Sequence, residues 1–150
     1  MACCNNLILS ATMGHIKCLN VLVSLGANIH TYRRRYKGSY EHVNDSTVLM
    51  HAAAHGQAEF VKELIVMGAD VNYHSKEGMS ALYIAARDGY ESVVDVLLTV
   101  PNLNLDMMTL DGQTAIKVSR DNGHHECSIK LLDEMRRRAD VSGDLIKKPK

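Results

Sequence analysis

A short motif that recurs four times along the chain constrains the fold more than any other feature. The copies occupy residues 7–14, 49–56, 82–89 and 116–123 and read LILSATMG, LMHAAAHG, LYIAARDG and IKVSRDNG. Each copy begins with an apolar residue, passes through small residues and ends on glycine. The last three glycines are 33 and 34 residues apart, whereas the first two are 42 apart. Self-similarity at such a period predicts a solenoid of stacked repeats.

The residues after each glycine also repeat, and their spacing predicts a second helix. Positions four, five, eight and nine after the glycine are mostly apolar, and they are Cys18, Leu19, Leu22 and Val23, then Phe60, Val61, Leu64 and Ile65, then Val93, Val94, Leu97 and Leu98, and lastly Cys127, Ser128, Leu131 and Leu132. This spacing places an apolar stripe on one helical face. Each unit is therefore two short helices joined by a glycine turn. Because one pair cannot bury its own stripe, the pairs must stack.

Two segments carry a family resemblance. TVLMHAAAHGQAEFVKELIVMGADVN (47–72) and SALYIAARDGYESVVDVLL (80–98) resemble the ankyrin repeat. The resemblance covers about residues 5–135, with repeats at about 5–30, 42–72, 75–106 and 109–135. It implies an all-α solenoid of stacked helix-turn-helix pairs with projecting β-hairpin-like loops. It also implies a non-catalytic protein–protein interaction module, in which the partner binds the concave face and the loops.

The two ends of the predicted array differ. In the fourth repeat Met135 stands where a helix-ending glycine would be, so the helix should run on to Arg138 with a polar outer face that suits a C-terminal cap. Residues 136–150 are expected to form a basic, disordered tail. Near the start, Leu7, Ile8 and Leu9 have no polar repeat before them. Either a partner or second copy covers this face, or the chain belongs to a longer protein; both alternatives stay open.

An insertion of about nine residues separates the first two repeats, within residues 31–45 (TYRRRYKGSYEHVND). Its basic and aromatic residues are Tyr32, Arg33, Arg34, Arg35, Tyr36, Lys37 and Tyr40. Tyrosine and arginine are enriched in interface hot spots, and arginine pairs with carboxylates or phosphates. We expect a contact loop for an acidic or phosphorylated protein segment; the alternative is a solvated insertion that binds nothing. Zero net charge argues against nucleic acid as the partner.

The resemblance implies further binding positions at the loop tips and at the two residues before each turn glycine. These are Val43, Asn44, Ser46, Ala54, His55, Lys76, Glu77, Met79, Arg87, Asp88, Leu110, Asp111, Gln113, Asp121 and Asn122. The strip changes from basic beside the insertion to acidic in the fourth repeat. About half of these residues are expected to be ordinary solvated side chains, because few interface residues carry the binding energy.

Catalytic, cofactor and metal sites are not expected. No glycine-rich phosphate loop, G-x-S-x-G or HExxH motif occurs. His51 and His55 have metal-ligand spacing but no evident third ligand, so His51 is interpreted as a core histidine. His124 and His125 follow a turn glycine and are interpreted as structural. Asn72 resembles a site that some ankyrin proteins offer to an asparagine hydroxylase; the alternative is that it only satisfies loop hydrogen bonds.

Cysteine usage and hydropathy predict a cytoplasmic or nuclear location. Cys18 and Cys127 fall at apolar positions and are expected to be buried thiols in a reducing compartment. The sequence contains no run of about 18 apolar residues, so no membrane span is predicted.

The alternative function is that of a fragment or regulatory subunit of a larger scaffold or enzyme complex, which docks through its first repeat.

Overall fold

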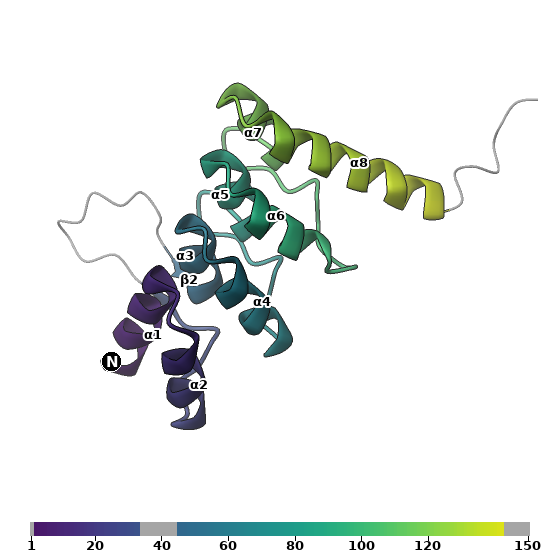
Figure 1. Cartoon of the computed structure of the whole chain (residues 1–150). Helices are drawn as coiled ribbons and strands as arrows, with labels where there is room; N and C mark the ends of the chain where they lie inside the picture. Colours follow the sequence, from purple (N-terminus) through teal and green to yellow (C-terminus); the bar gives the residue numbers. More distant parts are fainter. Residues whose placement is uncertain (1, 34–44, 143–150) are drawn as a thin grey trace, which may run out of the picture.

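The computed structural model describes residues 2–33 and 45–142, with side chains described from residue 5 to Thr31 and from Asp45 onward. In order, the elements are α1 (Ala2–Met13), α2 (Ile16–Ser24), β1 (Tyr32–Arg33), β2 (Ser46–Thr47), α3 (Val48–Ala54), α4 (Ala58–Val66), α5 (Ala81–Asp88), α6 (Glu91–Leu98), α7 (Ala115–Asp121) and α8 (His125–Val141). The helices form four antiparallel pairs stacked in one direction (Figure 1). The predicted all-α solenoid of helix pairs is confirmed.

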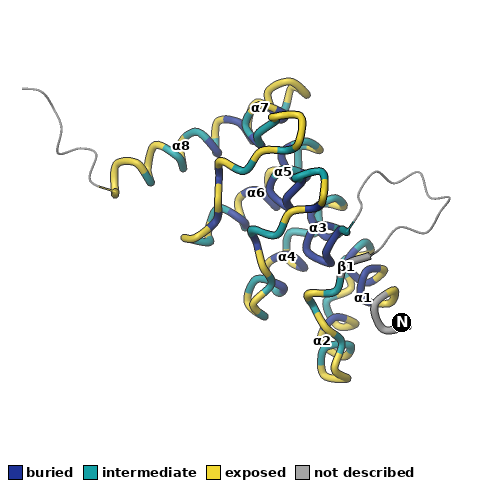
Figure 2. Tube along the Cα trace, turned by 180° about the vertical axis from the view of Figure 1, so that it is seen from behind, coloured by how far each residue is buried: buried dark blue, intermediate teal, exposed yellow. Residues whose placement is uncertain are grey.

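Stacking produces two rows of helices, one of α1, α3, α5 and α7 and one of α2, α4, α6 and α8 (Figure 1). The core between them is almost wholly aliphatic, and Phe60 is the largest of its fully buried side chains. Alanines such as Ala53 and Ala86 are fully buried, which lets neighbouring helices of the first row approach closely. Figure 2 shows the buried segments along the middle of the stack and exposed segments at the far end of α8.

A side-chain cap begins each first helix of the last three repeats. The hydroxyl oxygens of Thr47, Ser80 and Thr114 accept hydrogen bonds from the backbone N–H three residues on, at 3.3, 3.1 and 3.2 Å. Each bond satisfies one N–H that the helix itself leaves without a partner, a contribution of about 1 kcal/mol. These caps hold the start of each helix at the point where the preceding loop ends.

The turn glycines lie against the following repeat. Gly56 has φ +69°, and a Cβ added there would lie 2.6 Å from Cδ1 of Tyr90, the residue after the next turn glycine. Gly89 packs in the same way against the ring of His124. The structural interpretation of His124 is therefore confirmed, since its imidazole fills the space above the preceding turn.

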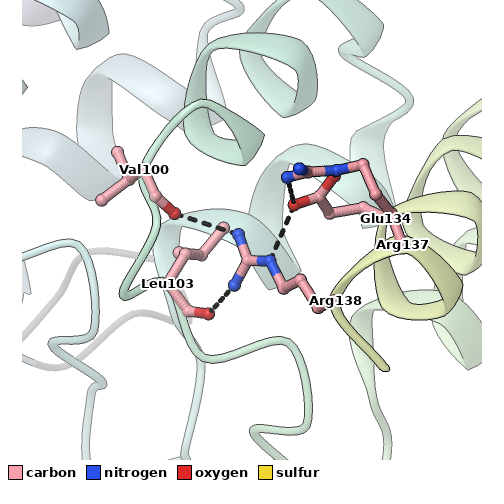
Figure 3. A network of polar contacts seen from close by, with 5 residues as sticks. All are labelled: Val100, Leu103, Glu134, Arg137 and Arg138. Carbon is pink, nitrogen blue, oxygen red and sulfur yellow. Dashed lines mark hydrogen bonds and ion pairs between the residues drawn. The ribbon is translucent and has the colours of Figure 1, made fainter. Parts of the chain in front are cut away.

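The C-terminal helix is longer than expected. α8 continues to Val141, so the expectation of disorder from residue 136 is wrong for residues 136–141; residues 143–150 lie outside the described part. Arg138 explains the extension (Figure 3). Its guanidinium donates to the carbonyl oxygens of Leu103 (2.6 Å) and Val100 (3.0 Å) in the loop after α6, and to Glu134 (2.7 Å). Charge-assisted bonds of this kind are stronger than neutral ones.

Three expectations about burial need correction. Cys18 is exposed, whereas Cys127 is buried as expected, and both are free thiols. Leu7 is fully buried, so in the N-terminal group it is Leu9, 61% exposed, that faces outward. His51 is half-buried rather than a core residue, and its Nε2 lies 2.8 Å from Oγ of Ser46. Cys18 and Leu9 are exposed because no described repeat precedes the first one.

Gly56→Ala should destabilise the chain more than Gly68→Ala. Both glycines have positive φ, which costs an alanine about 1–2 kcal/mol, but a Cβ at Gly68 meets nothing within 4 Å. At Gly56 the Tyr90 ring must move as well, for a total of about 2–4 kcal/mol. Urea unfolding of the two variants checks the difference. Equal losses would show that the Tyr90 contact is not a close one.

Arg138→Ala should lower the free energy of unfolding by about 1–3 kcal/mol, because two loop carbonyls lose a charged donor. Arg136→Ala is the matched control. The Arg136 side chain is 78% exposed and lies 3.9 Å from Asp133, so its loss should change stability by less than about 0.5 kcal/mol. Thermal unfolding monitored by circular dichroism measures both. A loss of the same size in the two variants would contradict a specific role for Arg138.

Stability should also depend on pH through Glu134. The hydrogen bond from Arg137, with a second from Arg138, lowers the pKa of Glu134 from 4.5 to about 2. Because the folded-state pKa lies below the unfolded one, this stabilisation is complete above pH 4.5 and is lost as the pH falls toward 2. The stability difference between the wild-type chain and Glu134→Gln should therefore be constant near neutral pH and shrink in that window. A pH-independent difference would contradict this assignment.

Candidate protein-binding surface

A hairpin precedes each of the helices α3, α5 and α7 of the first row, and we call these hairpins fingers. The first finger (residues 32–47) is closed by antiparallel pairing of β1 and β2, with Tyr32 opposite Thr47 and Arg33 opposite Ser46. The second (74–80) and third (108–114) are each closed by one antiparallel bridge, His74 to Ser80 and Met108 to Thr114. Since α3, α5 and α7 each begin directly after a finger, the helix stack sets the spacing of the fingers.

Neighbouring fingers are bonded to one another. The Lys76 ammonium of the second finger lies 3.2 Å from the Asp45 carboxylate of the first. The Leu110 N–H of the third donates to the Glu77 carbonyl of the second, at 3.0 Å. A Cβ at Gly78 would lie 2.7 Å from the Met108 carbonyl oxygen, so these two backbones touch. The row is thus largely preformed, which reduces the entropy lost when a partner binds.

The insertion itself falls mostly outside the described residues. Arg34, Arg35, Tyr36, Lys37, Tyr40, Val43 and Asn44 all lie there. For Tyr32 and Arg33 the structure describes the backbone, in β1. The insertion therefore begins and ends on paired strands, as a hairpin finger does, and its role in binding stays a prediction.

The other predicted binding residues divide by exposure. His55, Lys76, Asp88, Leu110, Asp111, Asp121 and Asn122 are exposed, and Ala54, Glu77, Arg87 and Gln113 are half-buried. Ser46 and Met79 are buried, at 2% and 9% exposure, so their side chains offer almost no contact area. Both lie on the returning arm of a finger, which turns inward to start the next helix.

Charges along this strip are partly paired. Arg87 forms a bidentate ion pair with Asp88, with Nε–Oδ1 and Nη2–Oδ2 distances of 2.7 and 2.9 Å. The hydrogen bonds that the Arg87 guanidinium donates to Asp88 raise the pKa of Arg87, so the guanidinium stays charged. Asn122 donates to the Arg87 carbonyl oxygen at 2.9 Å and joins the third repeat to the fourth. The second and third repeats thus present paired charges, while the fourth adds the exposed carboxylates of Asp111 and Asp121.

A groove between the second and third fingers was not predicted from the sequence. It is lined by Asn72, His74, Lys76, Gly78, Asn104, Met107, Met108 and Leu110. Met108 and Leu110 are 62% and 80% exposed, so they supply apolar surface beside the groove. The signal was present in the sequence as apolar residues in a loop tip, where polar residues are the rule.

Asn72 has a clear structural role beside this groove. Its Oδ1 accepts a hydrogen bond from the Asn104 N–H at 2.7 Å, and its Nδ2 donates to the Asn102 carbonyl oxygen at 2.8 Å. The interpretation that Asn72 satisfies loop hydrogen bonds is confirmed, and these bonds tie the loops after α4 and α6 together. Modification of Asn72, which the sequence did not favour, is not tested by these contacts.

Among the described residues, no three His, Cys, Asp or Glu side chains gather as a metal site would require. Across the same ranges, none of the helices combines the length and the apolar character needed to cross a bilayer.

Comparisons with known proteins agree with this architecture. The sequence profile for ankyrin repeats (many copies) matches residues 49–98. A putative ankyrin repeat protein of Rickettsia felis is 37% identical over 62 residues, which are 41% of this chain and 94% of that protein. A probable E3 ubiquitin-protein ligase of Oryza sativa subsp. japonica is 32% identical over 127 residues, 79% of this chain but 22% of the ligase.

A potassium channel of Oryza sativa subsp. japonica is 40% identical over 60 residues, 40% of this chain and 7% of the channel. This chain therefore spans only a small part of these two larger relatives, and their names describe proteins that contain much more than the matched repeats. The helix pairs, the projecting fingers, the profile match and the nearly full-length Rickettsia relative lead to one conclusion: the chain belongs to the ankyrin-repeat family.

Proposed function

We propose that the chain is a non-catalytic module that binds another protein along its fingers and the adjoining concave face. Ankyrin repeats are generally protein–protein interaction modules, and the observation that carries the proposal here is the bonded row of fingers. The Asp45–Lys76 ion pair and the Leu110–Glu77 hydrogen bond join three projecting loops into one surface. Such a preformed surface offers contact area at a low entropic cost.

The chemistry of the strip indicates the kind of segment that it would bind. At the first finger the sequence supplies Arg33, Arg34 and Arg35, which suit carboxylates or phosphates. Farther along, exposed Met108 and Leu110 flank a groove that suits an apolar side chain. We therefore expect a partner segment with an acidic or phosphorylated part over the first finger and an apolar anchor between the second and third.

The test uses two fluorescent peptides. One combines glutamate and phosphoserine with a central leucine; the other replaces the acidic residues by glutamine and serine. The acidic peptide should bind, and raising the ionic strength should weaken its binding, because exposed charges are screened. Changing Arg33, Arg34 and Arg35 to Glu should weaken it by about tenfold or more, a loss of about 1.4 kcal/mol. Fluorescence anisotropy measures both effects.

A matched control separates local contact from overall charge. Lys17, Lys62 and Arg136 are exposed on helices of the second row, away from the fingers. Changing these three residues to Glu alters net charge by the same amount and should leave the affinity nearly unchanged. Equal weakening in the two triple variants, or equal binding of both peptides, would overturn the proposed anchor.

A further inference from the structure

The first repeat exposes a face that the other repeats bury. Four residues after the turn glycine, Phe60, Val93 and Cys127 are 1%, 0% and 1% exposed, because the preceding repeat covers them. The equivalent residue of the first repeat, Cys18, is exposed. This position therefore belongs to the inter-repeat interface, and in the first repeat that interface is open.

The same comparison holds on the first helix. Five residues before the turn glycine, Ile84 and Val118 are 1% and 9% exposed and His51 is half-buried, whereas Leu9 is 61% exposed. Met13 and Val21 beside it are 60% and 57% exposed. Together Leu9, Met13, Cys18, Val21 and Leu22 line a groove between α1 and α2, which we call the N-terminal face.

At the opposite end of the stack, the outer face of the fourth repeat carries a charged residue. Three residues before the turn glycine, Ala11, Ala53 and Ala86 are fully buried against the following repeat. In the fourth repeat the equivalent residue is Arg120, which is exposed. A second copy therefore cannot stack its N-terminal face on this end without burying an arginine, so head-to-tail association is disfavoured.

The charge of the N-terminal face indicates what covers it. From residue 1 to residue 31 the sequence contains one charged side chain of the Asp, Glu, Lys and Arg types, Lys17. Lys17 lies in the lining of this groove beside apolar Leu9, Met13 and Val21, so the face carries one positive charge and no acidic side chain. It is complementary to an apolar face of its own size, and a second copy supplies one in an isologous arrangement.

We propose that two copies of the chain associate through their N-terminal faces about a twofold axis. This inference goes beyond the proposed binding function and does not depend on it. In the pair, the open interface of each first repeat is covered by the other. The dimer would present two equivalent strips, so that a partner with two binding segments gains from multivalency.

Sedimentation velocity over a range of concentrations tests the proposal. The wild-type chain should approach twice the monomer mass as its concentration rises. Leu9→Glu should raise the dissociation constant at least about tenfold, which is about 1.4 kcal/mol. Val66→Glu is the control: Val66 is 76% exposed on α4, away from the N-terminal face, and its replacement should leave the dimer intact. Circular dichroism verifies that both variants are folded.

Cys18 provides a second readout. In a chain with Cys3 and Cys4 changed to Ser, a short bismaleimide should link Cys18 to Cys18 of the second copy, while buried Cys127 does not react. The link should be absent in Leu9→Glu. A monomer at every concentration without cross-linking would overturn the proposal. A mass that rises beyond two copies would also overturn it, since that result indicates open-ended heterologous stacking.

Discussion

Burial of apolar surface between consecutive repeats is the interaction on which the rest of this structure depends. A single helix pair leaves one apolar stripe exposed, and a neighbouring pair covers that stripe. Phe60, Val93 and Cys127 are buried in this way by the repeat before them. Since each repeat contacts only its neighbours, the two outer faces of the stack have no further repeat against them. The two faces differ in polarity. Arg120 makes one end polar, whereas Leu9 and Cys18 leave the other apolar.

The finger surface follows from the same stack. Thr47, Ser80 and Thr114 cap α3, α5 and α7, so each finger ends at a defined point on the first row of helices. The repeat spacing then brings adjacent fingers within bonding distance, as the Lys76–Asp45 pair shows. The finger surface is thus supported by packed helices, while the second and third fingers are each closed by a single antiparallel bridge.

The sequence was sufficient for much of the fold but for less of the candidate site. Repeats, turn glycines and apolar stripes predicted the helix pairs, because burial in a solenoid is periodic along the chain. Exposure on the fingers was harder to predict. Ser46 and Met79 occupy binding positions by family resemblance, yet they are buried where each finger turns back to its helix. Met108 was not named as a binding residue, and Leu110 was named without the groove, because only the neighbouring finger makes a groove beside them.

Residue spacing alone indicated which residues form each repeat and that the array is apolar at its start. Local periodicity carries that information, since a helix shows its buried face every three or four residues. The tertiary structure decided which apolar residues are actually covered, as in the contrast between Leu7 and Leu9, and where the last helix ends. Arg138 stabilises α8 through carbonyl oxygens about 35 residues earlier in the chain. Contacts at that separation arise only when the repeats are packed, so no local pattern could have revealed them.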